Sequence, residues 1–538
     1  MTINFAMLTT FLCLACLLIS SQAAPAQLPK MISQSKRTPK GIHLPVKRQS
    51  RTRMTGISRR GDVTTSADLG DTEDLMYTVQ MKIGNTLMPF ALDTGSSDIW
   101  VASEDCQEQV CQSGVPLYST STFKSSGLPL NLTFGDSTSR TFASGVIGTD
   151  TIILAGVEIK GQLFISANST NNSLPLLGAS GNFGLSFPTE RQVLVTLCIY
   201  YHVFISNFPK PSSLLFEAIE HPFQQPPITS LDQVPDTFVM EGPLMSRLSQ
   251  SALVSPEFTL TLQREKFDIG DNNGLLSMGE LPPGVSNDSF TWVPVRRYTH
   301  AEGGLAAGNE TFPVQWEVPI DDVFIDGQRL PQSNLTPNIS LTGLVDSGSA
   351  AIRGPSDVVA NLNTILSGSP NTNIIDCGTP HTLAFQIGGK MFPIDPRDFY
   401  RQTVPDNLDN CTTNVVSTDP PKLGFLQSWV LGDQLFKSTI VSFYFGNLTH
   451  PSVDPPRIGF LSTVPPNADQ LYLKALANAK QNGNNFPASI VDAPAPTVSV
   501  FTTFLPPSPE PTNSVVSSDS SRPVPLFTSE QDISSGFV

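Results

Sequence analysis

Between residues 75 and 465 the chain consists of short apolar or alternating runs separated by clusters of Gly, Pro, Asn and Ser. Runs such as YTVQMKIG, FTLTLQ and TIVSFYFG have the two-residue period and the β-branched and aromatic content of strands. The best helical stretches are Gly242–Leu253 and Asp357–Leu366. About 390 residues of this character exceed one comfortable hydrophobic core. The pattern therefore predicts a mainly β protein with two lobes, residues 61–280 and 281–465.

The first residues differ in character from the rest. An apolar run from Phe5 to Ile19 ends in the small-residue segment Ser-Ser-Gln-Ala-Ala. This pattern is typical of a secretory signal peptide, which we place at residues 1–23, and the run is short for a membrane span. A buried N-terminal helix is the alternative. The signal predicts a secreted, extracellular protein with no membrane span in the mature chain.

Residues 24–60 form a strongly basic leader with ten Lys or Arg and no Asp or Glu. All 47 acidic residues follow position 60, against 22 basic ones, so the body carries a formal charge of −25. A basic leader binds an acidic body at neutral pH and is released when acid protonates the carboxylates. We therefore predict a propeptide, with Arg59-Arg60 as a processing site. A basic arm for nucleic acid or a membrane is the alternative, and the secretory signal argues against nucleic acid.

Cysteines and sequons agree with an oxidising compartment. Cys13 and Cys16 lie in the predicted signal peptide. Cys106 and Cys111 can close a short loop, and Cys377 and Cys411 can close a longer one. Cys198 is left without a partner in this pairing. Nine Asn-x-Ser/Thr sequons indicate a glycosylated surface: Asn131, Asn168, Asn171, Asn287, Asn309, Asn334, Asn338, Asn410 and Asn447. Residues 466–538 are rich in Pro, Ser and Thr with little periodicity, which predicts a disordered tail. Association of this tail with a cell wall is left open.

One motif occurs twice in the β-rich region. The segment ALDTGSSDIWVAS places Asp93 in a tight, glycine-containing loop between two apolar runs. Alone, this pattern also fits an Asp-Gly turn between two strands. The segment GLVDSGSAAIRGP repeats it 253 residues later around Asp346. The repetition predicts two halves of one site, one half from each lobe.

Two neighbouring carboxylates share a proton, because both cannot ionise comfortably at short distance. One then activates a water while the other donates a hydrogen bond to a substrate carbonyl, which is general acid–base hydrolysis without a covalent intermediate. Small and hydroxyl residues beside them allow close backbone approach and orient the loops: Thr94, Gly95, Ser96, Ser347, Gly348 and Ser349. The six His show no metal-ligand spacing, and no HExxH, GxSxG or phosphate-cradling Gly loop occurs, so no metal or cofactor is expected.

These features resemble the pepsin-like aspartic endopeptidases, particularly the secreted fungal members with a basic propeptide. Further ordered landmarks are the Cys106–Cys111 loop, SSGNFGLSFP, LVSPEFTLTL, TWVPV, the Cys377–Cys411 pair, WVLGDQLF and RIGFL. The resemblance implies a bilobal acid protease fold with two β-barrel-like lobes and the active-site cleft between them. It also implies that Asp93 and Asp346 are catalytic, that protein or peptide substrates and the propeptide bind, and that the protein is a monomer.

The hairpin over the site departs from the family pattern. The family usually carries Tyr-Gly-x-Gly-Ser there, with the Tyr hydroxyl bonded to the indole of the Trp after the first motif. Here the matching run is Phe134-Gly135-Asp136-Ser137, opposite Trp100. Phe134 keeps an apolar wall for substrate but cannot make that bond, a loss of about 1 kcal/mol if nothing replaces it. Asn182 and Arg353 also stand where apolar residues are common in this family.

Residues 191–209, RQVLVTLCIYYHVFISNFP, are the second departure. A loop here is normally polar and exposed, and this one is apolar and contains Cys198. It is short for a membrane span and would separate two parts of one lobe. Our hypothesis is that residues 191–209 come from an intron that was wrongly kept in the coding sequence.

Taken together, the sequence predicts a secreted, acid-active aspartic endopeptidase made as a zymogen. The alternative is a catalytically weak, glycosylated wall or surface protein that uses the fold as a binding module.

Overall fold

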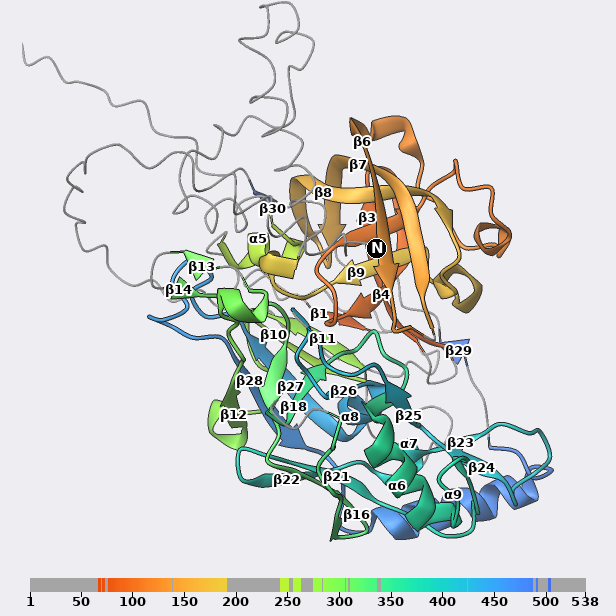
Figure 1. Ribbon diagram of the computed structural model, residues 1–538. Helices are drawn as coiled ribbons and strands as arrows, with labels where there is room; N and C mark the ends of the chain where they lie inside the picture. Colours follow the sequence, from red (N-terminus) through yellow and green to blue (C-terminus); the bar gives the residue numbers. More distant parts are fainter. Residues whose placement is uncertain are drawn as a thin grey trace, which may run out of the picture. The chain divides into compact units, whose positions relative to one another are not determined.

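Strands dominate the computed structural model of this chain (Figure 1), as the hydrophobic pattern predicts. The structure describes residues 66–68, 70–72, 76–137, 139–190, 242–250, 255–262, 274–282, 284–304, 306–307, 310–335, 340–422, 424–486, 490–491 and 502–504. The predicted signal peptide, propeptide and 191–209 segment lie outside these residues, as does Cys198.

In the N-terminal lobe six strands close into a barrel, since each pairs with the next and the last pairs back to the first. In this order they are β3 (Tyr77–Ile83), β4 (Thr86–Asp93), β9 (Gly181–Gly184), β5 (Ile99–Ala102), β8 (Val157–Thr170) and β7 (Thr141–Leu154). Alternate residues of β3, such as Val79 and Met81, are fully buried inside it. Strand β6 (Lys124–Phe134) forms a long hairpin with β7. Short strands at the margin are β2 (Gly70–Thr72), β29 (Ile490–Val491) and β30 (Thr502–Phe504).

A six-stranded sheet joins the two halves of the chain. It contains β1 (Ser66–Asp68), β11 (Leu275–Met278), β10 (Glu257–Thr261), β27 (Thr439–Tyr444), β28 (Arg457–Ser462) and β12 (Thr291–Pro294), in that order. The strands come from both sides of the predicted lobe boundary at residue 280. Because β10 pairs with β27, Phe258 stacks on Phe443 with ring centroids 4.6 Å apart. The two lobes therefore share part of their core.

The C-terminal lobe is built from smaller sheets. The largest runs β15 (Glu317–Pro319), β18 (Thr342–Val345), β26 (Trp429–Leu431), β19 (Ile352–Pro355) and β25 (Val415–Thr418). The others are β17 (Gln328–Arg329), β16 (Asp322–Ile325), β21 (Leu383–Ile387) and β22 (Lys390–Pro393); β20 (Ile374–Ile375), β24 (Cys411–Thr413) and β23 (Tyr400–Gln402); and β13 (Ala306–Ala307) with β14 (Glu310–Thr311).

Helices are few and short among the described residues. They are α5 (Leu244–Gln250), α6 (Ser356–Ser367), α7 (Pro396–Phe399), α8 (Asp433–Ser438) and α9 (Ala468–Gln481). The two predicted helices are confirmed in α5 and α6. Both predicted disulfides are also formed, Cys106–Cys111 with an S–S distance of 2.06 Å and Cys377–Cys411. Within the described ranges no helix combines the length and apolar content needed to cross a membrane.

The prediction of a disordered tail from residue 466 is wrong for its first part, because α9 packs on the C-terminal lobe. Its buried residues recur with a helical period: Ala468, Tyr472, Ala475, Leu476 and Ala479. The Tyr472 hydroxyl donates to the Cys377 carbonyl at 2.7 Å, and its ring stacks on Tyr400. The Pro- and Ser-rich composition of the whole segment hid this short periodic stretch. Residues 505–538 lie outside the described part.

Candidate active site

The strands that carry the two Asp-hydroxyl-Gly loops repeat one arrangement. In the first half β9 lies between β4 and β5, parallel to β4 and antiparallel to β5, and β8 runs parallel to β5. In the second half β26 lies in the same way between β18 and β19, and β25 runs parallel to β19. Asp93 ends β4 and Asp346 follows β18 directly. The two motifs are therefore structurally equivalent as well as similar in sequence.

The two loops are cross-bonded by the hydroxyl residues that follow each Asp. Thr94 Oγ1 donates to the Val345 carbonyl at 2.8 Å and accepts from Ser347 N at 2.9 Å. Ser347 Oγ donates to the Leu92 carbonyl at 3.0 Å and accepts from Thr94 N at 3.1 Å. All four bonds are buried. Each hydroxyl thus fixes the backbone of the opposite half and holds the two loops in register.

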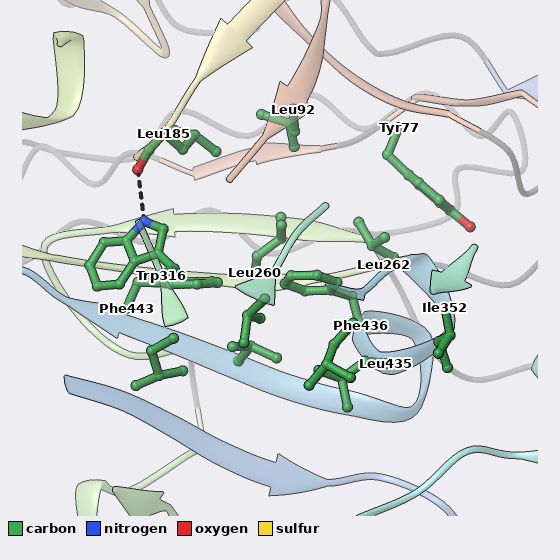
Figure 2. Close-up of a cluster of buried hydrophobic side chains, with 14 of the residues drawn as sticks. Tyr77, Leu92, Leu185, Leu260, Leu262, Trp316, Ile352, Leu435, Phe436 and Phe443 are labelled. Atoms are coloured by element: carbon green, nitrogen blue, oxygen red, sulfur yellow. Dashed lines mark hydrogen bonds between the residues drawn. The ribbon is translucent and has the colours of Figure 1, made fainter. Parts of the chain in front are cut away.

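A buried aromatic cluster also contacts the backbone near Asp93. Trp316, fully buried, donates from Nε1 to the Leu185 carbonyl at 3.1 Å, as Figure 2 shows. Leu185 N in turn donates to the Asp93 carbonyl at 2.7 Å. Phe187 packs against Trp316 with ring centroids 4.1 Å apart. The backbone of Asp93 is therefore linked through Leu185 to a buried aromatic cluster.

Asp93 is surrounded by hydrogen-bond donors. Its Oδ1 accepts from Gly95 N at 2.9 Å. Its Oδ2 accepts from Ser96 Oγ at 2.5 Å and from Asn182 Nδ2 at 2.7 Å. The side chain is only 8% exposed. Three donors therefore converge on this one carboxyl group.

Asp346 lies in a poorer environment. Gly348 N donates to its Oδ1 at 2.8 Å, which matches the Gly95 contact in the first half. Ser349, the counterpart of Ser96, instead donates from Oγ to the Ala351 carbonyl at 2.8 Å. A Cβ atom built at Gly348 would lie 2.5 Å from Asp93 Oδ1 and 3.2 Å from Asp346 Oδ1, so the two carboxyl groups lie close together. Desolvation, followed by the Asp93 charge, raises the pKa of Asp346 from 3.8 to about 8. The geometry therefore favours a pair in which Asp346 carries the shared proton.

Both glycines of the motifs are required by the opposite carboxyl group. A Cβ atom at Gly95 would lie 2.4 Å from Asp346 Oδ1, and one at Gly348 would lie 2.5 Å from Asp93 Oδ1. Neither distance is compatible with a side chain. The prediction that these positions let the backbone approach the pair closely agrees with this packing.

Phe134 lies against Trp100, where the sequence alignment puts it. Their ring centroids are 6.3 Å apart. Trp100 is fully buried, and within the described part of the chain its Nε1 has no hydrogen-bond partner. Phe134 has no hydroxyl to accept from this N–H, and no other group in the described part of the chain accepts from it. An unsatisfied buried N–H of this kind costs on the order of 1–3 kcal/mol.

The tip of the β6–β7 hairpin is bound to the second half of the chain. Asp136 Oδ2 accepts from Arg353 Nη1 at 2.7 Å. Ser137 donates to the Asp419 carboxylate through N at 3.0 Å and through Oγ at 2.5 Å. Gly135 supplies the turn with a φ of 79°. Sequence analysis singled out Asp136 and Arg353 separately, and nothing in the sequence indicates that they pair.

Arg353 also has an informative position in the repeat. It pairs with Val430 across β19 and β26, as Trp100 pairs with Asn182 across β5 and β9. Arg353 is therefore the counterpart of Trp100 in the second half.

No group of three or more His, Cys, Asp or Glu side chains that could hold a metal occurs among the described residues.

Known proteins match this chain over most of its length. A family model described as eukaryotic aspartyl protease matches residues 76–208 and 230–450. The chain belongs to the eukaryotic aspartyl protease family. Its fold is accordingly the bilobal, mainly β pepsin-like fold.

Individual aspartyl proteases are distant relatives. Pepsin F of Oryctolagus cuniculus is 26% identical over 372 residues, covering 67% of this chain and 76% of the relative. Major aspartyl peptidase 1 of Cryptococcus neoformans var. grubii is 22% identical over 436 residues, covering 78% and 73%. Cathepsin D of Dictyostelium discoideum is 24% identical over 401 residues, covering 71% and 84%. These relatives come from animals, fungi and amoebae, so the fungal subtype stays a prediction.

The family match covers most of the apolar 191–209 segment. The matched region continues to residue 208 and resumes at 230, so the unmatched stretch is 209–229. The retained-intron hypothesis stays a prediction, and sequencing of the spliced message decides it.

Proposed function

We propose that this chain is an active aspartic endopeptidase that hydrolyses peptide bonds with a water activated between Asp93 and Asp346. The observation that carries the proposal is that cross-bonded, structurally equivalent loops bring these two carboxyl groups close together. Family membership supplies the reaction class, and the paired carboxylates supply its chemistry.

Each residue has a defined part in this reaction. The Asp93 carboxylate takes a proton from the water, whose oxygen attacks the substrate carbonyl carbon. Asp346 gives its proton to the carbonyl oxygen, which leaves a neutral tetrahedral gem-diol and a proton on Asp93. Asp346 then takes back a hydroxyl proton while Asp93 protonates the amide nitrogen, the C–N bond breaks, and acid and amine products leave. The pair returns to its singly protonated state, so protons balance over the cycle.

The remaining site residues position substrate and loops. Trp100, Phe134, Gly135 and Asp136 belong to the hairpin side of the site, and extended peptides with apolar side chains next to the cleaved bond are the substrate class we infer. Thr94 and Ser347 hold the two halves at a fixed separation. Misplacement of reacting groups by about 1 Å costs on the order of 100-fold in rate, so these bonds matter for turnover.

Secretion, zymogen formation and acid activity complete the proposal. The apolar N-terminal run, the basic leader and the acidic body support export as a monomeric precursor with an inhibitory propeptide at residues 24–60. A pair that must hold one proton supports activity in acid. The two disulfides agree with an oxidising, extracellular destination.

The test uses the whole chain after the signal peptide, with and without residues 191–209. After acidification, we expect cleavage of a denatured protein substrate that a statine-type inhibitor blocks. Asp93→Asn should abolish cleavage while the melting temperature of the protein stays close to that of the wild type. Absence of acid-dependent cleavage in both forms, or equal cleavage by the Asp93→Asn variant, would overturn the enzyme proposal in favour of a binding module.

A further inference from the structure

Asn182 is a buried amide in contact with one carboxyl group of the pair. It lies in β9, is 4% exposed, and pairs with Ala91 of β4 on one side and Trp100 of β5 on the other. Its Nδ2 donates to Asp93 Oδ2 at 2.7 Å and to Ser96 Oγ at 3.0 Å. Ser96 Oγ then donates its own proton to the same carboxylate oxygen. Asn182 thus acts on Asp93 both directly and through Ser96.

Within the described residues the second half of the site has no equivalent donor. Val430 occupies the matching position, since it pairs with Leu344 of β18 and Arg353 of β19. Ser349 is turned to the Ala351 carbonyl, and among the described residues no side-chain amide or hydroxyl donates to Asp346. The repeated strands therefore place three donors on one carboxyl group and one backbone donor on the other. The asymmetry arises from side chains and not from the backbone.

Other charged groups near the pair do not reverse this asymmetry. Arg353 lowers the pKa of Asp346, but its guanidinium is bound to Asp136 of the hairpin. Other acidic side chains on neighbouring segments are Asp98, in the loop after Asp93, Asp433, next to the end of β26, and Glu317 of β15, which pairs with Leu344 of β18. The buried Glu317 carboxylate accepts hydrogen bonds from Arg296, Tyr298 and Thr342. Asp98 lies on the Asp93 side and Asp433 on the Asp346 side, where Asp433 N donates to the Ser349 carbonyl.

Building on the proposed function, we propose that Asn182 is a positioning residue that keeps Asp93 ionised and leaves the shared proton on Asp346. A hydrogen bond to the charged form of a carboxyl group lowers the pH at which that group gains a proton. Asn182 therefore extends activity toward lower pH by delaying protonation of the Asp93 carboxylate. It does not stabilise either charge state of Asp346 directly, so the loss of activity at high pH is independent of it.

The test compares pH profiles of kcat/KM for the wild type and Asn182→Val, which copies the residue present in the second half. We expect the acidic limb of the profile to move up by about one pH unit while the basic limb stays in place. Val430→Asn is the matched control, because it offers an amide to Asp346 and should move the basic limb down instead. Melting temperatures and active-site titration with a statine-type inhibitor establish that each variant is folded and count its sites.

The outcomes separate this inference from the proposed function. If the wild type shows no inhibitor-sensitive cleavage in acid, the proposed function fails. If the wild type is active and Asn182→Val keeps both limbs, or moves both together, the role of Asn182 is overturned. If Asn182→Val does not fold, Asn182→Ala replaces it, since Ala removes the amide without adding volume or another hydrogen-bond donor. The same upward shift of the acidic limb is expected, and an unchanged limb overturns the inference.

Discussion

At the scale of single residues, the molecule tolerates an unsatisfied indole beside its paired carboxyl groups. Trp100 Nε1 is buried without a partner within the described residues, and Phe134 covers it with a ring that has no hydroxyl. Leaving such a donor unpaired is costly, so the site gives up stability that a single oxygen atom could restore.

Phe134→Tyr should restore this bond. A hydroxyl added to the ring can accept from Trp100 Nε1, which is expected to raise the free energy of unfolding by about 1 kcal/mol. Urea denaturation measures the change, and kcat/KM for a peptide substrate tests whether a fixed hairpin also favours turnover. Phe142→Tyr is the control, because Phe142 lies in the same hairpin away from Trp100 and should leave stability unchanged. Equal effects of the two substitutions would contradict the prediction.

Residue identity alone was sufficient to single out Asp93 and Asp346 as a candidate pair and to detect the missing Tyr hydroxyl. Both Asp motifs can be recognised from a few adjacent residues, and Phe134 differs from the family pattern at a single position that can be aligned. The consequence of Asn182 could not be predicted in this way. Its amide is significant only because β9 lies between β4 and β5, and that pairing joins residues 89 positions apart.

At the scale of elements, the hairpin β6–β7 is held at its tip by two contacts with the second half. The Arg353–Asp136 ion pair is largely shielded, with side-chain exposures of 25% and 9%, and Ser137 adds two bonds to Asp419. Breaking a shielded pair leaves a charge without its partner, which costs more than losing an exposed pair. We therefore expect the contacts of Arg353 and Asp419 to control how readily the hairpin moves away from the site.

Arg353→Met should loosen the hairpin tip. The amides of residues 131–145 are expected to exchange with deuterium several-fold faster, since about 1–2 kcal/mol of closing free energy is lost. Arg329→Met is the matched control, because its partner Asp322 lies in an exposed pair on β16 and β17. In that variant exchange in the hairpin should not change. Unaltered exchange in Arg353→Met would show that other contacts hold the tip.

Elements were predictable where their pattern was local. The strands, helices α5 and α6 and both disulfides follow from periodicity and spacing. Helix α9 was missed because four turns of helical period are diluted by the composition of the tail around them. The sheet that joins β10 and β27 was missed for a different reason. Its strands are nearly 180 residues apart, and no local pattern specifies which distant strands will pair.

At the scale of the whole molecule, the acidic body and the paired carboxyl groups act in the same direction on stability. The region after residue 60 carries a formal charge of −25, so ionisation at rising pH increases self-repulsion. The pair adds a specific contribution, since the folded protein holds a proton on Asp346 that the unfolded chain would release. Both effects favour the folded state in acid, the condition in which we propose that the enzyme works.

The contribution of the pair can be isolated with Asp346→Asn. The pKa of Asp346 is 3.8 without the folded environment and about 8 within it, so the folded state binds more protons between these values. Stability due to this group is therefore complete below about pH 4 and decreases as pH rises toward 8. The melting temperature of the wild type should fall over this range, and that of Asp346→Asn should fall less, because an amide has no proton to lose. General repulsion of the acidic body affects both proteins alike. A variant whose melting temperature falls as steeply as that of the wild type would show that Asp346 holds no extra proton.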